Sequence, residues 1–281
     1  MKKILVTGAN GQLGSELAVL SSNYPQYEWV FADRTQITLD DLDILKAQLN
    51  QIQPDVIFNC GAYTAVDKAE AEKELAFTIN DRAVELIAKY TQENNVKLIH
   101  ISTDYVFDGT SSIALNENEE TNPVNVYGAS KRAGEIACLK ENPNSIIIRT
   151  SWVYSKFGNN FVKTMQRLMQ ERDVINVVND QIGSPTYATD LAQAMVDILE
   201  FSEWTPGIYN YSNEGEISWY EFALSIKQFG GYSCNVGGIS SASYPTPAKR
   251  PAFSLLDKKK IKTIYNLDIP NYKESLKKMF I

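Results

Sequence analysis

Histidine and cysteine are scarce in this sequence, and their scarcity limits the chemistry that the chain can carry. One histidine, His100, and three scattered cysteines, Cys60, Cys138 and Cys234, occur among the 281 residues. Three separated cysteines predict neither a disulfide framework nor a zinc-binding cluster. His100 lies within an apolar strand pattern, which favours a buried structural histidine. Catalysis by a histidine or by a cysteine nucleophile therefore has no support.

Long apolar runs and an excess of positive charge are also lacking. No stretch is long enough to span a bilayer, and the apolar run after Met1 is too short for a signal peptide. The net charge of −7 argues against general binding of nucleic acids or anionic membranes. We therefore expect a cytoplasmic protein that binds neither nucleic acid nor membrane. The sequence leaves open whether it is a monomer or a homodimer.

Strands and helices alternate in the first half of the chain. Apolar runs predict strands at residues 3–7, 29–32, 56–59, 97–102 and 145–149, and helical patterns cover 12–20, 42–50, 76–93 and 126–140. This alternation predicts the α/β class, with a Rossmann-like doubly wound parallel sheet. After residue 149 tyrosine, tryptophan and proline become denser. We expect an NAD(P)-binding domain from residues 1–151 plus about 188–204, and a smaller C-terminal substrate lobe from about 152–187 and 205–281.

A glycine-rich turn opens the chain. Gly8, Gly11 and Gly14 are spaced as Gly-x-x-Gly-x-x-Gly between the first predicted strand and the first predicted helix. Glycine permits a tight turn and a close approach of the backbone to a pyrophosphate, which the free N–H groups of the helix then bind. In this context the turn predicts dinucleotide binding.

Further candidates follow the later strands. Asp33, 19 residues after Gly14, is placed to bind the adenosine ribose, and Arg34 beside it is placed to accept a 2′-phosphate. Together they leave the choice between NADH and NADPH open. Small residues at 59–62 allow a cofactor to pass close to the backbone. Thr103 ends the fourth strand, where open α/β sheets bind ligands, and is a candidate to bind a substrate carbonyl or the Tyr127 oxygen.

Tyr127 and Lys131 form the most informative pair. Four residues apart on a predicted helix, their side chains share one face. A phenol donates a proton readily only if its pKa falls from about 10. An ammonium one turn away lowers that pKa by favouring the phenolate. The pair therefore predicts a proton donor and its electrostatic partner.

These motifs resemble those of a known family. The matching segments are residues 6–14, 59–70, 102–109, 127–131, 149–154, 180–186 and 250–257, which extend over nearly the whole chain. The sequence resembles extended short-chain dehydrogenases/reductases and, more narrowly, dTDP-4-dehydrorhamnose reductases. The turn and the Tyr-x-x-x-Lys pair identify the superfamily. The segments Ala-Tyr-Thr-Ala-Val-Asp and Gly-Ser-Pro-Thr are more specific.

The resemblance implies a reaction and a set of site residues. Hydride passes from NADPH or NADH to the 4-keto carbon of dTDP-4-dehydro-L-rhamnose, with Tyr127 as general acid, Lys131 as its pKa-lowering and ribose-binding partner, and Thr103 orienting the carbonyl. The implied cofactor contacts are Gly8, Asn10, Gly11, Gln12, Leu13, Gly14, Asp33, Arg34, Cys60, Gly61, Ala62, Tyr63, Ser102, Tyr127 and Lys131. The implied contacts with the dTDP-sugar are Val66, Thr103, Asp104, Tyr127, Trp152, Gly183, Ser184, Pro185, Thr186 and Arg250, with Arg250 on the diphosphate.

One departure from the family pattern concerns the adenine pocket. Where the family often has Asp followed by Ile or Leu at the adenine pocket, this chain has Thr38 and Leu39, which leaves Asp40 or Asp41 for that contact. Mg²⁺ is associated with some family members, and only the resemblance suggests it here. No compact carboxylate cluster of the Mg²⁺ type is visible. We expect Glu16 and Asp190 to be helix-surface acids and predict no metal ligands.

Two other interpretations remain open: a nucleotide-sugar dehydratase or epimerase on the same scaffold, and a non-catalytic binding protein. A nucleotide-sugar dehydratase of this superfamily usually has Asp-Glu after the threonine, but here Asp104 is followed by Tyr105. An epimerase on the same scaffold retains its nicotinamide through the cycle. A non-catalytic binding protein of the same fold, such as the regulatory subunit of methionine adenosyltransferase, also stays open, because a fold does not establish an activity. The glycines and the presence of Thr103, Tyr127 and Lys131 favour the reductase.

Overall fold

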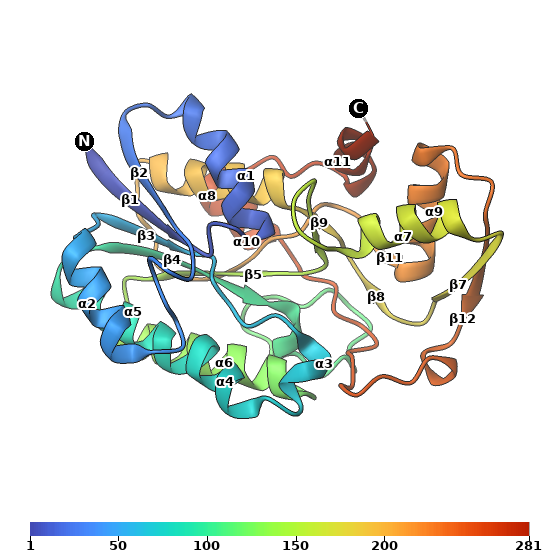
Figure 1. Cartoon of the computed structure of the whole chain (residues 1–281), viewed down its shortest axis with the longest axis horizontal. Helices are drawn as coiled ribbons and strands as arrows, with labels where there is room; N and C mark the ends of the chain where they lie inside the picture. Colours follow the sequence, from blue (N-terminus) through green and yellow to red (C-terminus); the bar gives the residue numbers. More distant parts are fainter. Residues whose placement is uncertain (281) are drawn as a thin grey trace.

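The centre of the computed structural model, which describes residues 1–280, is a six-stranded parallel sheet (Figure 1). Its order is β10-β5-β4-β3-β1-β2. The strands are β1 (Lys2–Thr7), β2 (Tyr27–Ala32), β3 (Val56–Asn59), β4 (Lys97–Thr103), β5 (Ile146–Thr150) and β10 (Gly207–Asn210). Every residue of β3 and β5 is buried, as expected for a parallel sheet covered on both faces. The predicted fold class is confirmed.

Helices cover both faces of this sheet. On one face lie α1 (Gln12–Leu20), α8 (Ala188–Glu200) and α10 (Lys259–Tyr265); on the other lie α2 (Leu42–Ile52), α5 (Ala83–Glu93) and α6 (Val126–Glu141) (Figure 1). Side chains alternate along β1, so that Ile4 and Val6 join the core under α1 and α8, and Leu5 joins the core under α2 and α5.

The strand order reverses beside β1. β2 pairs with one edge of β1, and β3 pairs with the other and continues toward β4, β5 and β10. Ligands of open α/β sheets bind outside the carboxyl ends of the strands at such a reversal. The glycine-rich turn that follows β1 therefore lies where a cofactor is expected.

A π-helical segment interrupts the third helical region. The pattern predicted one helix over residues 76–93, but α4 (Lys73–Phe77) passes into a π-helix (Thr78–Arg82) before α5 begins. A short helix, α3 (Val66–Ala69), precedes them. Such π-segments are frequent at functional sites, and this one brings the buried Asn80 to the site described below.

A smaller unit with its own core lies at the right of Figure 1. Its helices are α7 (Phe161–Glu171), α9 (Trp219–Gly230) and α11 (Tyr272–Lys277). Its paired short strands are β6 (Val153–Tyr154) with β9 (Thr186–Tyr187), β7 (Val174–Val178) with β12 (Asn235–Ile239), and β8 (Ile182–Gly183) with β11 (Ile217–Ser218). Single 3₁₀ turns occupy Ser21–Asn23, Asp104–Val106, Ser241–Ser243 and Lys278–Phe280.

Two segments assigned from sequence to the substrate lobe pack with the central sheet instead. β10 pairs in parallel with β5, and Ile261 and Tyr265 of α10 join the core under α8. The sheet therefore takes its sixth strand from residues 207–210. The remaining division of the chain into two units stays a prediction. Within residues 1–280, no helix has the length and apolar character needed to cross a membrane.

Candidate active site

A cavity of about 1010 Å³ opens at the carboxyl ends of the central strands. It brings together segments that are far apart in the sequence, from the glycine-rich turn to the start of β6. The predicted site residues that line it are Gly8, Asn10, Gly11, Gln12, Leu13, Asp33, Arg34, Cys60, Gly61, Ala62, Tyr63, Val66, Ser102, Thr103, Asp104, Tyr127, Lys131 and Trp152. Its volume suits a ligand larger than a single sugar.

The turn between β1 and α1 can be built only with glycine at two points. Gly8 has φ +66°, and a Cβ there would lie 2.8 Å from the Gly61 backbone. A Cβ on Gly14 would lie 2.4 Å from the Gly8 carbonyl oxygen, so Gly14 serves the packing of the turn and does not line the cavity. Gly11 caps α1, leaving the first N–H groups of the helix free to bind an anion. This cradle fits the pyrophosphate of a dinucleotide.

Acidic and basic side chains lie together at the end of β2. The Asp33 carboxylate accepts hydrogen bonds from the backbone N–H and the hydroxyl of Thr35, which lower its pKa. Arg34 is exposed, borders the cavity, and forms no ion pair within residues 1–280. Of the two candidates for the adenine contact, Asp40 lines the cavity, whereas Asp41 caps α2 by accepting from the Ile44 N–H at 3.0 Å.

Local packing fixes the helix that carries Tyr127 and Lys131. Asn125 caps α6 by accepting from the Gly128 N–H at 2.7 Å. Glycine is required at 128, because a Cβ there would lie 2.1 Å from the Tyr105 carbonyl oxygen. The Tyr105 ring meets the Tyr127 ring edge to face, with centroids 5.6 Å apart. The phenol is thereby held at the cavity wall.

Burial, more than charge, controls the Tyr127 proton. Desolvation raises the pKa of Tyr127 to about 12, and the Thr103 hydroxyl acts in the opposite direction. Lys131 is buried, and its Nζ donates to the Ile101 carbonyl at 2.6 Å. Its burial lowers the pKa of Lys131 to about 8. The expected lowering of the tyrosine pKa by lysine is therefore not the dominant effect in the structure, because burial disfavours both charged forms.

Asp104 is a buried carboxyl beside Thr103. Oδ1 accepts from the Thr103 hydroxyl at 3.1 Å. Oδ2 has no partner of good hydrogen-bond geometry among the described residues, although the Ser254 side chain lies near enough to lower the pKa of the carboxyl. Burial raises the pKa of Asp104 to about 6. An unpaired buried acceptor that borders the cavity is suited to a ligand hydroxyl group.

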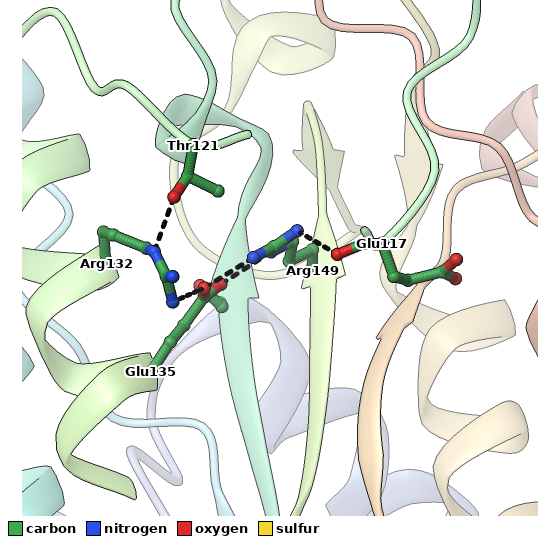
Figure 2. A network of polar contacts seen from close by, with 6 residues as sticks. Glu117, Thr121, Arg132, Glu135 and Arg149 are labelled. Atoms are coloured by element: carbon green, nitrogen blue, oxygen red, sulfur yellow. Dashed lines mark hydrogen bonds and ion pairs between the residues drawn. The ribbon is translucent and has the colours of Figure 1, made fainter. Parts of the chain in front are cut away.

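A buried ion-pair network stands behind the site. Figure 2 shows Glu135 of α6 facing Arg149 of β5, with two hydrogen bonds of 2.8 Å between the carboxylate and the guanidinium. Ser102 of β4 donates to the same carboxylate at 2.6 Å, and Arg132 approaches it at 3.2 Å while donating to Thr121. The network joins the helix of the Tyr/Lys pair to the two strands that end at the cavity.

Trp152 has an unusual backbone conformation at the cavity wall. Its φ is +47°, rare for a residue with a side chain, and its ring stacks on Trp219 at 3.7 Å between centroids. Strain of this kind is concentrated at functional sites. A Cβ on Gly183 would lie 3.0 Å from the Trp152 ring, so glycine at 183 leaves room for the stack.

The segment 183–186 lies behind the cavity wall. The Ser184 hydroxyl donates to the Asn213 carbonyl, and the Ser184 carbonyl accepts from Ser151 at 2.6 Å. Thr186 is hydrogen-bonded to Thr150 at 3.0 Å. Gly183, Ser184, Pro185 and Thr186 are all buried and absent from the cavity lining. The structure therefore gives them a supporting position, where the sequence predicted direct contact.

Arg250 is engaged in an ion pair at the rim of the cavity. Its Nη1 and Nη2 donate to the two carboxylate oxygens of Asp67 at 3.0 and 2.8 Å. Asp67 follows Val66, which lines the cavity. The bond with Arg250 is the main cause of the lowered pKa of Asp67. Arg250 does not itself line the cavity, so a role on the diphosphate requires exchange of Asp67 for the ligand.

The comparisons with known proteins agree over the full length. Residues 1–281 match the family model described as "RmlD substrate binding domain". A dTDP-4-dehydrorhamnose reductase of Aggregatibacter actinomycetemcomitans is 41% identical over 288 residues, covering 99% of this chain and 98% of the relative. The chain belongs to the dTDP-4-dehydrorhamnose reductase family.

Solved structures of the family have the same fold. A dTDP-4-dehydrorhamnose reductase of Bacillus anthracis in complex with NADP has a TM-score of 0.94 and 39% identity, covering 100% of this chain and 99% of that one. The protein of the same name from Clostridium acetobutylicum has a TM-score of 0.94 and 36% identity, covering 99% and 98%.

One positioning residue of this family member was missed from sequence. The buried Asn80 side chain accepts from the Tyr63 N–H at 2.9 Å and donates to the Tyr63 carbonyl at 3.0 Å. It is also bonded to the Ser130 hydroxyl, between Tyr127 and Lys131. Asn80 therefore fixes the loop after β3, which lines the cavity, against α6. An asparagine in a helical pattern gives no local signal of this.

The acidic residues considered for a metal are used otherwise. Glu16 is buried and accepts from the Ser155 hydroxyl at 2.5 Å, so the expectation of a helix-surface acid is wrong for it. Asp190 is bonded to Asn213, Ser275 and Lys278. Within residues 1–280, no group of three or more His, Cys, Asp or Glu side chains is placed to hold a metal ion.

Proposed function

We propose that this chain reduces the 4-keto group of dTDP-4-dehydro-L-rhamnose to give dTDP-L-rhamnose, with NADPH or NADH as the reductant. The chain is an oxidoreductase of the dTDP-4-dehydrorhamnose reductase family. The observation that carries the proposal is the convergence of Thr103, Tyr127 and Lys131 with the glycine cradle on one cavity. The match with the family over the whole chain supports the choice of substrate.

The side chains of the cavity divide the chemistry among them. A nicotinamide bound at the glycine cradle and Lys131 would supply the hydride, which would leave negative charge on the substrate carbonyl oxygen. Tyr127 donates the proton. An alkoxide is a stronger base than a phenolate, so this transfer is favourable even with the Tyr127 pKa near 12. Thr103 orients the carbonyl, and Lys131 binds the nicotinamide ribose and, when protonated, stabilises the phenolate that Tyr127 leaves.

We further propose NADPH as the preferred reductant. Arg34 is exposed at the cavity edge beside Asp33, with a guanidinium suited to a 2′-phosphate. Both hydrogen bonds from Thr35 go to Asp33 Oδ1, so only Oδ2 is left for the ribose hydroxyls that NADH would present. The Bacillus anthracis relative was solved in complex with NADP.

The substrate contacts of the proposal follow the cavity lining. Trp152 and Asp104 face the sugar, with the unpaired Asp104 Oδ2 as an acceptor for a hydroxyl group. Arg250 at the rim binds the diphosphate in place of Asp67. The segment 183–186 acts indirectly, by supporting Trp152.

A spectrophotometric assay tests the proposal. NADPH or NADH oxidation is followed with dTDP-4-dehydro-L-rhamnose as substrate, and steady consumption of the reduced cofactor is expected. Tight retention of a nicotinamide without net consumption indicates an epimerase instead. Absence of cofactor binding indicates a non-catalytic protein.

Tyr127→Phe is the matched variant for this assay. The ring and its packing remain while the acidic proton is lost, so we expect normal cofactor binding and a fall in kcat of about 10²–10⁴-fold. Titration of NADPH binding serves as the control for folding. A Phe variant with wild-type turnover removes Tyr127 from its role.

A further inference from the structure

A continuous line of buried hydrogen bonds connects the cofactor cradle with Lys131. The Gly61 N–H donates to Thr7 Oγ1 at 3.0 Å, and Thr7 Oγ1 lies 2.7 Å from Asn59 Oδ1. Asn59 Nδ2 lies 3.0 Å from His100 Nδ1, and His100 Nε2 lies 3.4 Å from Lys131 Nζ. The four side chains are at most 2% exposed. The line therefore has to satisfy its hydrogen bonds internally.

The Gly61 N–H determines which atom donates and which accepts in each hydrogen bond of this line. The Gly61 N–H can only donate, so Thr7 accepts from it. The Thr7 hydroxyl proton has one recorded acceptor among the described residues, Asn59 Oδ1. Asn59 therefore turns its NH₂ group toward His100, and His100 Nδ1 must present a lone pair.

The imidazole proton consequently lies on Nε2. Burial and the neighbouring lysine hold the pKa of His100 well below its ordinary value, so the ring is neutral. A neutral imidazole with a free Nδ1 carries its proton on Nε2. That N–H points toward Lys131 Nζ. The ammonium form of Lys131 has no lone pair with which to accept a hydrogen bond from this N–H, whereas the amine form has one.

We propose that His100, locked as the Nε2–H tautomer by Gly61, Thr7 and Asn59, is a positioning residue that favours the amine form of Lys131. The amine accepts from His100, donates to the Ile101 carbonyl at 2.6 Å, and keeps one N–H for the cavity. The positive charge of Lys131 near Tyr127 is then present at pH values below the Lys131 pKa and is lost as the pH rises through it. His100 thus gains a role in the proposed reductase beyond that of a core residue.

The other groups that face Lys131 come from two elements. Glu135 and Cys138 lie on α6, and Cys60 follows β3. The Glu135 carboxylate favours the ammonium, whereas burial raises the pKa of both thiols, that of Cys138 to about 11, so they are uncharged at mildly basic pH. The Glu135 carboxylate is already bonded to Arg149, which weakens its pull on the lysine proton. Burial outweighs these groups, and the pKa of Lys131 falls to about 8. The amine and the ammonium are therefore both populated at mildly basic pH.

Nitrogen NMR of the wild-type chain tests the tautomer directly. Because His100 is the only histidine, ¹⁵N-histidine labelling gives the signals of one ring without assignment. We expect an unprotonated Nδ1 and a protonated Nε2, unchanged from about pH 5 to about pH 9. A protonated Nδ1, in either a neutral or a charged ring, overturns the proposal. The proposal's role for His100 rests on the proposed function, but this measurement does not require turnover, so the two can fail separately.

Two variants test whether the Thr7 hydroxyl fixes the tautomer of His100. Thr7→Val removes the hydroxyl that fixes Asn59, so the amide can turn and His100 can move its proton to Nδ1. We expect the tautomer to change and the basic limb of the kcat profile to move up by about one pH unit, the equivalent of one hydrogen bond.

Thr91→Val is the matched control. Thr91 is equally buried and also forms two hydrogen bonds, to Ala88 and Asn142, but it lies on α5 outside the line. It should leave the His100 signals and the pH profile unchanged. Two results would show that Thr7 does not fix the His100 tautomer. Either Thr7→Val keeps the wild-type tautomer and the wild-type basic limb of the kcat–pH profile, or Thr91→Val shifts both to the same extent.

Discussion

Two arginine–carboxylate pairs in this protein are each joined by two hydrogen bonds, but their surroundings differ. Glu135 and Arg149 are 0% and 1% exposed, whereas Asp67 and Arg250 are 40% and 23% exposed. Both pairs have two hydrogen bonds of 2.8–3.0 Å. Burial decides their capacities. The inner pair cannot lose a partner without leaving an uncompensated charge, while the rim pair can exchange one for solvent or a ligand.

The difference assigns separate roles to the two pairs. The inner pair, drawn in Figure 2, holds α6 against β4 and β5. The phenol, the lysine and Thr103, which these elements carry, thereby keep their relative positions. The rim pair keeps a guanidinium ready for an anionic ligand at the edge of the cavity. One pair is a framework, and the other is a candidate binding group.

Breaking the inner pair should have the largest effect on the fold. Glu135→Gln leaves the Arg149 charge buried without its partner, and we expect the free energy of unfolding to fall by about 3–5 kcal/mol. Urea unfolding measures this. The double variant Glu135→Gln/Arg149→Met removes both charges and should lose less than the sum of the single variants. Additive losses contradict the coupling of the pair.

Breaking the rim pair should instead affect binding. Arg250→Ala should raise the KM for the nucleotide sugar by a factor that corresponds to about 1.5–3 kcal/mol, while NADPH binding stays intact. Asp67→Asn removes the competing carboxylate and should change the KM little or lower it. Steady-state kinetics at low salt distinguish these outcomes. A wild-type KM for Arg250→Ala removes the arginine from the diphosphate site.

Asp104 extends the comparison to a buried carboxyl that forms no ion pair with the residues the structure describes. The pKa of Asp104 is about 6 in the folded chain, against an ordinary 3.8. Between these pH values the Asp104 carboxyl of the folded chain holds a proton that the unfolded chain has lost. The stability that this protonated carboxyl contributes is therefore fully present below about pH 3.8 and is lost as the pH rises through about 6. Asp104→Asn should therefore increase the free energy of unfolding by about 2–3 kcal/mol at pH 8 and by little at pH 4.

Denaturant unfolding of both proteins at these two pH values measures the difference. The variant should also raise the KM for the sugar, because an amide replaces the acceptor at Oδ2. Equal stability changes at both pH values contradict the assigned pKa.

Arg34, which is exposed and forms no ion pair with the residues that the structure describes, should give the smallest effect. Arg34→Ala should weaken NADPH by about 1.5 kcal/mol, near tenfold, because its contact with the 2′-phosphate is solvated. NADH affinity should hardly change, since NADH lacks that phosphate. Titration with both cofactors checks this. Equal losses show that Arg34 does not read the 2′-phosphate.

The elements with a local signature were predicted well. The strand after residue 55 and the helix that starts at Gln12 begin where the apolar periodicity and the glycine turn place them. Tyr127 and Lys131 face one cavity because helical spacing alone sets their common side. Such features depend on neighbours within a turn or a strand, which the sequence displays directly.

The supporting residues have no such signature. Asn80 reaches Tyr63 across 17 residues and Ser130 across 50, and Asn59 reaches His100 across 41. The contact between Asn59 and His100 arises only when β3 pairs with β4, and those of Asn80 arise only when the π-helix packs against α6 and the loop after β3. Ser184 and Thr186 were predicted to contact the substrate, and their hydroxyls face other buried groups of the chain, so contact with the substrate stays a prediction for them. Residue type alone does not distinguish a lining position from one layer behind it.

Transfer of deuterium from the cofactor tests the central claim most directly. The wild-type protein is given dTDP-4-dehydro-L-rhamnose and NADPH that carries deuterium at the transferred position, and the sugar is analysed by mass spectrometry and NMR. We predict dTDP-L-rhamnose with one deuterium on C4 for each NADPH oxidised. A nucleotide sugar without deuterium, or an altered sugar formed with no net oxidation of NADPH, contradicts a reductase.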